Sequence, residues 1–435
     1  MAHRRQPRLL SAFRRWAFAA AVALGLPGCR GLDRLLSVEP QDRVPASSVE
    51  NSPVNAQLLV NGAIADFECA FGAYVLIGGV IGEELEETRQ IIDRKPYDQR
   101  VHTSKDRTAV VNRCESAGVY TPLQTARVSA ERVLQLLEKW SDGEVPQRAA
   151  LIATMQAYAG YATLLLGEGY CSTVISSPGA NGEIVFGGEI SRDSAFKLAD
   201  ARFAAAMAAS PQAGASNVRD LALVGRARAR IDLGDFAGAR NDASGVPPAF
   251  RFEMSASASS LRRHNRVWSQ ERVSDVTSIG VPYRSLGDPR VPVQDMRRTG
   301  PLGVPVFWQN KYSTAASPIR IASGDEARLI IAESDIAAGT ATSLENAKSI
   351  IDAFRARGSQ PPLASADQAT LREALIDQRR RELFLESQHL GDVIRFGVSL
   401  RPLPGTAYPG GGVYGTQKCL FLPDVERQNN PMLGG

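Results

Sequence analysis

The sequence holds few of the residues on which metal sites and common catalytic motifs depend. Only four histidines and five cysteines occur among its 435 residues, and no CxxC pair is present, so a metal site has little material. GxSxG, P-loop, HExxH and EF-hand patterns are also missing, and Gly167-Glu168-Gly169 lacks the third glycine of a dinucleotide fingerprint. We therefore expect a protein that is not an enzyme, with no catalytic residue, no cofactor and no metal ion.

The charged residues give no sign of a nucleic acid partner. The formal net charge is +4, and part of it comes from arginines at the N-terminus. No stripe of Lys and Arg with interleaved aromatic residues occurs, as a nucleic-acid-binding surface would require. With 44% hydrophobic and 22% charged residues, the composition is that of an ordinary globular protein.

The N-terminus has the layout of a bacterial export signal. Five arginines precede a short apolar run: Arg4, Arg5, Arg8, Arg14 and Arg15. The run from Trp16 to Leu26 is about 11 residues long, well short of the roughly 20 needed to cross a bilayer. It closes on Leu26-Pro27-Gly28-Cys29, which resembles a lipobox. We therefore expect residues 1–28 to be a lipoprotein signal peptide, although an ordinary signal peptide with an incidental cysteine is the alternative.

Cys29 is then the expected lipidation site and the first residue of the mature chain. Several acyl chains on one thiol give stable anchoring, at about 0.8 kcal/mol per buried methylene. Arg30 follows Cys29 in place of the aspartate that marks inner-membrane retention, so we expect the outer membrane. No later stretch reads as long and apolar enough to span a membrane, so residues 29–435 are expected to form one tethered domain.

Four further cysteines would share an oxidising compartment: Cys69, Cys114, Cys171 and Cys419. An even number there favours one or two disulfides, or buried free thiols. The sequence does not choose among the three full pairings.

Helical periodicity dominates the mature chain and predicts the all-α class. We expect helices at about Ala56–Gln90, Leu123–Trp140, Gln147–Leu166, Asp193–Ala208, Val218–Leu233, Phe236–Ala243, Asp325–Ala338, Leu344–Arg357 and Asp367–Phe396. Three capping boxes mark helix starts: Ser323 with Glu326, Thr342 with Glu345, and Ser365 with Gln368. Gly339 and Gly358 stand where helix C-caps need positive φ.

Two segments read as helical hairpins of tetratricopeptide type. Leu221–Ala243 is interrupted by Gly234-Asp235, and Asp325–Arg357 repeats the plan with a longer turn after Gly339. Such hairpins bury their apolar faces only by stacking on neighbours. The full repeat signature is missing, so generic helix packing is the alternative.

A loop-rich region from about residue 245 to 320 separates these hairpins. It is rich in Pro, Gly, Ser and Arg, and a few strands are expected to be confined to it. Its aromatic residues suit a sugar-binding or peptide-binding surface, because they offer flat apolar area with a polar edge. The candidate ligand residues are Trp268, Tyr283, Trp308 and Tyr312. The alternative is that each packs the loops onto the scaffold.

Three segments near the C-terminus carry the most specific pattern. They read EARLIIAE over Glu326–Glu333, AKSIIDAFRARG over Ala347–Gly358, and IDQRRRELFLESQHLGDVIRFG over Ile376–Gly397. Together they resemble helices of the SusD/RagB family of nutrient-uptake lipoproteins. The closing residues Pro423, Glu426, Asn430 and Pro431 resemble that family's Ile-Pro-x-x-Glu-x-x-x-Asn-Pro element.

The resemblance is specific over Asp325–Pro431 and looser near Val38–Ser48 and around Glu83 and Glu84. Positions that match are Arg379, Glu382, Leu383, Glu386, Asp392, Arg395 and Gly397. Positions that depart from the common Glu, Gly, Arg and Trp are Gln378, Ser387, His389 and Phe396. These departures indicate a divergent branch.

The resemblance implies a SusD-like fold and a binding protein at the outer membrane, facing the cell exterior. It implies an oligosaccharide or peptide ligand that is handed to a TonB-dependent SusC-like transporter. Two other classes stay open, a tetratricopeptide-like adaptor lipoprotein in envelope assembly and a divergent hydrolase.

Charged residues of the last helix have a structural interpretation. Arg379, Glu382 and Glu386 are three and four positions apart, and Asp392 and Arg395 are three apart, so ion pairs along one face are available. A catalytic carboxylate pair is the competing interpretation, disfavoured because neighbouring arginines would hold the acids ionised.

A second acidic group stands near the N-terminal end of the mature chain. Its members are Glu83, Glu84, Glu86 and Glu87. We expect a solvated helix face there, with a bound cation or polar ligand as the alternative.

The anchor is testable on its own. Cys29→Ala removes the only thiol at the lipobox, so we expect loss of metabolic labelling with palmitate and release of the protein from the membrane fraction. A variant that is still labelled would show that Cys29 is not the acylated residue.

Overall fold

The computed structural model describes residue 50 and residues 52–434, except 112–117, 180–182 and 211–215. The chain divides into two units, Met1–Ser52 and Pro53–Gly435, and the second unit is described below. The expected signal peptide, Cys29 and the Val38–Ser48 segment lie outside the described residues.

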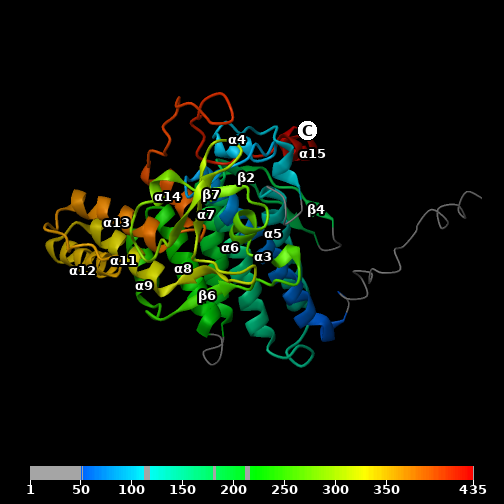
Figure 1. Ribbon diagram of the computed structural model, residues 1–435. Coiled ribbons are helices and arrows are strands. Elements are labelled where there is room, and N and C mark those ends of the chain that lie inside the picture. Colours follow the sequence, from blue (N-terminus) through cyan, green and yellow to red (C-terminus); the bar gives the residue numbers. More distant parts are fainter. Residues whose placement is uncertain (1–49, 51, 112–117, 180–182, 211–215, 435) are drawn as a thin grey trace, which may run out of the picture. The chain divides into compact units, whose positions relative to one another are not determined.

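Helices dominate this unit, and every expected helix has a counterpart (Figure 1). The bounds are α3 Ala56–Ile81, α5 Tyr120–Lys139, α6 Arg148–Gly169, α7 Arg192–Ala209, α8 Ser216–Asp232, α9 Phe236–Ser244, α11 Gly324–Ala338, α12 Ala341–Arg357, α13 Gln368–Glu382 and α14 Gln388–Phe396. Short helices add α4 Lys95–Asp98, α10 Arg266–Arg272 and α15 Asp424–Asn429. The predicted all-α class is confirmed.

Short strands pair two by two and antiparallel. The pairs are β1 Leu85–Glu87 with β7 Thr277–Ile279, β2 Ser172–Val174 with β5 Glu189–Ser191, β3 Ser177–Pro178 with β4 Ile184–Val185, β6 Arg251–Met254 with β10 Ile319–Ser323, and β8 Val293–Thr299 with β9 Pro305–Gln309. The expectation that strands are confined to residues 245–320 is wrong, because β1 to β5 precede that region. In β1 and β7, Leu85 lies opposite Ile279, which ties the chain after α3 to the loop-rich region.

The hydrophobic core is built around α3 and α6, which lie at the centre of the unit in Figure 1. Every residue of α3 from Phe67 to Ile81 is buried, and so is every residue of α6 from Met155 to Gly169. Both helices are apolar all round, as a helix enclosed by other helices must be. A smaller apolar cluster holds α11, α12 and α13 together around Phe354.

Two helices of the described residues are long and apolar enough to cross a membrane by length and composition alone, Pro53–Ile81 and Arg148–Gly169. The expectation that no stretch after Arg30 meets this test is therefore wrong. In their apolar windows 83% and 72% of the residues are buried inside the fold. That burial is typical of core helices in a globular body, so the test by itself is weak evidence for a span.

The expected helix ends hold for α11. The Ser323 hydroxyl accepts a hydrogen bond from Glu326 N at 3.1 Å, and Gly339 has the positive φ of 66° expected of a C-cap. This end leads directly into α12. The hairpin that α11 and α12 form is therefore the one expected from Asp325 to Arg357. The expectation of a longer turn after Gly339 is wrong, because α12 already begins at Ala341.

Later caps differ from the expected ones by two residues. Thr340 and Ser343 form the capping box of α12, and Asp367 caps α13 by accepting from Thr370 N at 2.9 Å. Thr342 and Ser365 were the wrong choices, because an equally suitable hydroxyl or carboxylate stands two positions away. Gly358 has a negative φ. A Cβ there would lie 2.3 Å from Asp288 Oδ2, so close approach rather than φ requires this glycine.

The expected helix Asp367–Phe396 is two helices, α13 and α14, separated by a turn. Leu385 and Ser387 take φ values of 56° and 92° in this turn. Left-handed backbone at non-glycine residues costs on the order of 1 kcal/mol or more and persists only where surrounding contacts hold it. Leu385 N donates to Glu84 Oε1 at 2.7 Å, and Tyr312 Oη donates to Leu385 O at 2.9 Å. Distant side chains therefore stabilise this turn.

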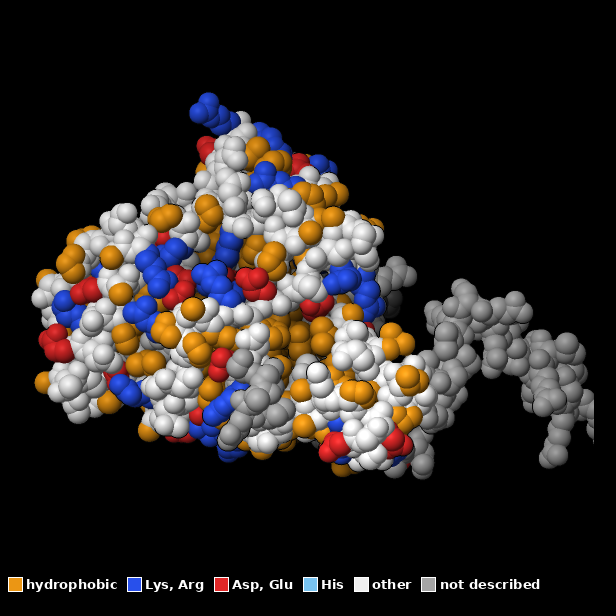
Figure 2. Space-filling view, turned by 90° about the horizontal axis from the view of Figure 1, so that it is seen from below, with side chains coloured by type: hydrophobic (Ala, Val, Ile, Leu, Met, Phe, Trp, Pro, Cys, Tyr) orange, Lys and Arg blue, Asp and Glu red, His pale blue; other side chains and the backbone are white. Residues whose placement is uncertain are grey.

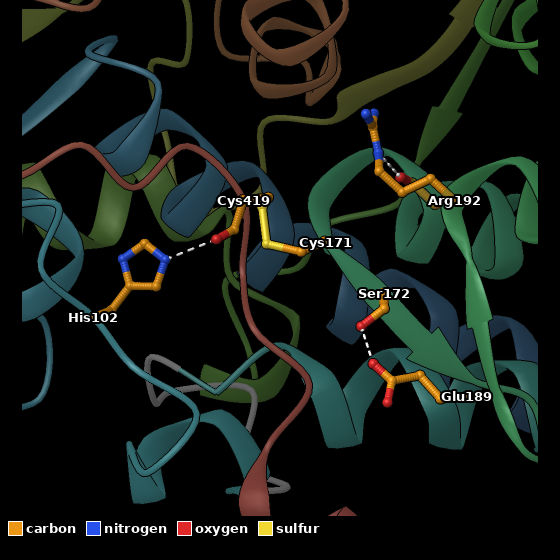
Figure 3. Close-up of a disulfide and its surroundings, with 7 residues drawn as sticks. His102, Cys171, Ser172, Glu189, Arg192 and Cys419 are labelled. Atoms are coloured by element: carbon orange, nitrogen blue, oxygen red, sulfur yellow. Dashed lines mark hydrogen bonds between the residues drawn. A yellow bond between two sulfur atoms is a disulfide. The ribbon is translucent and has the colours of Figure 1, made fainter.

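A disulfide holds the C-terminal segment to the end of α6. Cys171 and Cys419 are bonded, with their Cα atoms 5.3 Å apart, and Cys419 O lies 3.0 Å from His102 Nε2 (Figure 3). The full pairing that remains would join Cys69 to Cys114, and Cys114 lies outside the described residues.

Candidate functional site

The four aromatic candidates lie on separate elements of the loop-rich region. Trp268 is on α10, Tyr283 ends the 3-10 helix Val281–Tyr283, Trp308 is on β9, and Tyr312 follows β9. Tyr283 and Tyr312 are only 1% and 3% exposed, whereas the two tryptophans are half-buried. The structure therefore divides the set into two core residues and two surface residues.

Tyr283 and Tyr312 pack against the turn between α13 and α14. The ring of Tyr283 stacks on Phe384 at a centroid distance of 5.1 Å and meets His389 edge to face at 5.8 Å. Tyr312 bonds to the backbone of the same turn through its hydroxyl. These contacts give both tyrosines a packing role, and ligand contact by either stays a prediction.

Trp268 and Trp308 present the aromatic surface of this region. Trp268 packs its inner side against the main core. The ring of Trp308 lies under two guanidinium groups, with Arg272 Cζ at 4.2 Å and Arg298 Cζ at 5.6 Å from its centroid. Arg298 is also bonded to Asp275. A ligand ring that stacks on Trp308 must therefore compete with these arginines.

The motif acids lie beside this region in a buried ion-pair network. Arg320 on β10 bonds through Nε to both carboxylate oxygens of Glu386 at 2.9 Å. Its Nη2 lies 3.4 Å from Glu382 Oε1. Lys311 bonds to Glu386 as well. The sequence predicted ion pairs along one helix face, but Glu382 and Glu386 pair with residues of the loop-rich region instead.

Asp392 and Arg395 form the second part of the network. Asp392 accepts from Arg379 Nε and from Arg395 Nη2, both at 2.8 Å, and Arg395 also holds Glu333 on α11. The pair three positions apart within α14 was therefore predicted correctly, while Arg379 reaches across from α13. These bonds fix α13, α14 and α11 against one another.

A third part joins the network to α6 and α8. Arg228 binds the Glu168 carboxylate through two bonds of 2.6 Å, a bidentate geometry that orients both groups. Glu168 can lie inside the fold because glycines flank it. A Cβ at Gly167 or Gly169 would lie 2.6 Å from the ring of Phe196 or Tyr74. The Gly-Glu-Gly sequence is thus a packing motif.

The pKa values of these acids show how charge is balanced. Burial favours the neutral form, yet the charges of Arg379 and Arg395 hold the pKa of Asp392 below its usual range. For Glu382, burial outweighs Arg320 and raises the pKa. Burial also raises the pKa of Glu326 to about 7. We expected neighbouring arginines to keep the pKa of these acids from rising, which holds for Asp392 and is wrong for Glu382.

The acidic group after α3 is not a solvated helix face. Helix α3 ends at Ile81 rather than Gln90, Glu83 has a φ of 65°, and β1 follows. Glu84 and Glu87 are 2% and 1% exposed. The expectation failed because both buried acids have partners inside the fold. Glu84 accepts from Leu385 N, and Glu87 lies 3.0 Å from Arg94.

Metal and nucleic acid sites find no support in the described part of the chain. Among these residues, no group of three or more His, Cys, Asp or Glu side chains could hold a metal ion. On the face drawn in Figure 2, basic and acidic side chains are interspersed rather than gathered by sign.

Comparison with known proteins identifies the architecture. The sequence model of the SusD family matches residues 302–430, which contain the whole motif segment and the ion pairs of Glu386 and Asp392 described above. The C-terminal part of the chain is therefore similar to the SusD family over these residues. A search of curated protein sequences found no match.

Solved structures of SusD superfamily proteins share the fold. One from Bacteroides vulgatus has a TM-score of 0.68 at 13% identity, covering 87% of this chain and 97% of its own. One from Bacteroides fragilis has a TM-score of 0.67 at 13% identity, covering 89% and 100%. A SusD-like carbohydrate binding protein from Bacteroides vulgatus has a TM-score of 0.66 at 14% identity, covering 88% and 97%.

Sequence reasoning missed most partners of the motif acids. Arg228, Lys311 and Arg320 carried no local signal, because each lies 60 or more positions from the acid it binds. Glu168 stood out only as part of a failed dinucleotide fingerprint. The position of this glutamate between two glycines, in an otherwise apolar helix, could have indicated a buried ion pair.

Glu84 provides a test of the buried network. Burial raises its pKa from 4.5 to about 8, so the fold prefers the protonated acid. Its contribution to stability is fully present below about pH 4.5 and is lost as pH rises toward 8. Glu84→Gln mimics the protonated form at every pH. The free energy of unfolding of this variant, minus that of wild type, should therefore increase as pH rises, by at most about 1.4 kcal/mol per pH unit.

Urea denaturation at several pH values between 5 and 8 measures this difference. Glu345→Gln, at an exposed position on α12, is the matched control. Its free energy of unfolding should change with pH in the same way as that of wild type. If the free energy of unfolding of Glu84→Gln also changes with pH as that of wild type does, Glu84 is not protonated in the fold.

Proposed function

We propose that this chain is a nutrient-binding lipoprotein of the SusD family in the outer membrane, with a signal peptide over residues 1–28 and one SusD-like domain over 29–435. It captures an oligosaccharide or peptide and delivers it to a TonB-dependent SusC-like transporter. The observation that carries the proposal is the family match over residues 302–430 together with the shared fold.

The ligand surface of this proposal lies around Trp268 and Trp308. Both rings sit on regular elements, α10 and β9, and both are half-buried, so their positions are fixed while part of each ring stays accessible. Rigid aromatic surface is what recognition of sugar rings or peptide side chains requires. A structural relative carrying the name SusD-like carbohydrate binding protein supports an oligosaccharide as the first ligand class to test.

Delivery to a transporter follows from the proposed anchor. A protein held at the membrane by acyl chains on Cys29 captures its ligand outside the permeability barrier, so import needs a separate pore. Family resemblance names that pore as a SusC-like barrel. Binding and release would then be the whole task of this chain, which accords with a role that involves no catalysis.

Trp308→Ala should weaken binding of the cognate ligand by about 1 to 3 kcal/mol, because a stacking ring near the centre of a binding surface contributes that much. A panel of oligosaccharides and short peptides, measured by isothermal titration calorimetry, identifies the ligand first. Trp268→Ala is the second test variant.

Trp140→Ala is the matched control. Trp140 is also half-buried but follows α5, outside the loop-rich region, so its loss should lower stability and leave affinity unchanged. Tyr312→Phe should likewise lose stability only, by about 1 kcal/mol for one hydrogen bond. Equal affinities for both tryptophan variants and wild type would move the ligand surface elsewhere.

A further inference from the structure

A cavity lies on the helical scaffold and includes none of the aromatic candidates. Its volume is about 690 Å³, and it is lined by the ends of α7, α8, α11, α13 and α14. This volume falls in the range of sites for small organic molecules. The cavity is therefore separate from the proposed nutrient surface.

Part of the wall of this cavity is apolar, and part of it is charged. Leu233, Ile336, Leu375 and the ring of Phe396 line it. Phe396 already lies beside cationic groups, with Arg395 Cζ at 4.0 Å and Arg372 Cζ at 5.6 Å from its centroid. These side chains suit the apolar body of an organic ligand, whereas a cationic group would have to compete with Arg395 and Arg372 for the Phe396 ring.

The cavity is also lined by a buried carboxylate that receives no hydrogen bond from the described residues. The Asp232 side chain is 6% exposed, and its nearest cation is Arg395 Nε at 3.5 Å. Arg395 directs its hydrogen bonds to Glu333 and Asp392 instead. Among the described residues, no donor forms a hydrogen bond with the Asp232 carboxylate, although a buried acid ordinarily has such partners.

Hydrogen bonding around Arg395 leads to the same residue. The guanidinium groups of Arg395 and Arg379 bond to Glu333 and Asp392. Asp232 is the carboxylate of this group that receives no hydrogen bond within the described part of the chain, so a donor that enters from the cavity would be its hydrogen-bond partner.

The rim limits the charge of the occupant. Arg192 and Arg372 stand there with one exposed acid, Asp193. Arg192 is held by a bond of 2.8 Å from its Nε to Gly167 O (Figure 3), so it keeps a positive charge near the mouth. A single ammonium group that reaches Asp232 is therefore favoured over a polyamine.

We propose that this cavity is a binding site for a small organic monocation with an apolar body, whose ammonium group bonds to the Asp232 carboxylate. The apolar body lies against Leu233, Ile336 and Phe396. Each ammonium hydrogen bond to a buried carboxylate is charge-assisted, which makes it stronger than a bond between neutral groups.

Protonation of Asp232 would control this site. Burial and the charge of Glu168 raise the pKa of Asp232 to about 7, and Arg395, Arg228 and Arg192 oppose the rise. The charged groups around it are Glu168 on α6, Arg192 on α7, Arg228 on α8, Glu333 on α11, Arg379 on α13, and Asp392 and Arg395 on α14. Because the ammonium group needs the ionised acid, affinity should fall as pH drops below about 7.

Calorimetric titration of the mature protein with 2-phenylethylamine at about pH 8 tests the site, with the neutral analogue 2-phenylethanol alongside. Wild type should bind the amine at least about tenfold more tightly than the alcohol, since a bond to a charged group contributes on the order of 1.5 kcal/mol or more. Asp232→Asn should remove that preference. Asp193→Asn, at the exposed rim, should change affinity by less than about fivefold.

Ala337→Trp is a second variant that leaves the buried acids in place. Ala337 is exposed and lines the cavity, so an indole there should block both probes. Equal binding of amine and alcohol by wild type would overturn the proposal. So would an unchanged preference in Asp232→Asn. If Asp232→Asn does not fold, two other measurements decide. The proposal is wrong if the Ala337→Trp variant still binds the amine and wild type still binds it at about pH 6.

Discussion

Arginines that are buried together with acids decide how the helices and loops of this fold are joined. A charge taken out of water costs several kcal/mol unless it is paired and hydrogen-bonded, so each arginine fixes where its acid must lie. Arg320 brings β10 to the end of α13 through Glu386, and Arg228 brings α8 to α6 through Glu168. Removing one partner would leave the other buried and unpaired, which is the costly case.

The network connects the helical scaffold to the loop-rich region at the turn between α13 and α14. Leu385 in this turn takes left-handed backbone, held by Glu84 from β1's side and by Tyr312 from the loops. The loops that carry Trp268 and Trp308 thus rest on a turn that distant residues stabilise. This arrangement explains why the C-terminal motif is rich in charged residues although its helices are largely buried.

Local sequence patterns predicted the helices. Contacts between residues far apart in the sequence determine the features that these patterns did not predict. Periodicity placed α8, α9 and α11 to within a few residues, because apolar spacing follows from which face is buried. The break after Glu382 and the burial of Glu84 escaped prediction, since both depend on contacts more than 60 positions away. For the candidate site, sequence singled out four aromatic residues, but only tertiary packing separates Tyr283 and Tyr312 in the core from the tryptophans at the surface.

The central claim is that this chain serves as the binding partner of a membrane transporter. The most direct measurement is gentle detergent extraction through a C-terminal tag, followed by identification of co-purified proteins. We predict a TonB-dependent barrel protein in about equal amount with the tagged protein. Recovery of the tagged protein alone, under conditions that preserve known complexes of this kind, would contradict this claim and favour an adaptor in envelope assembly.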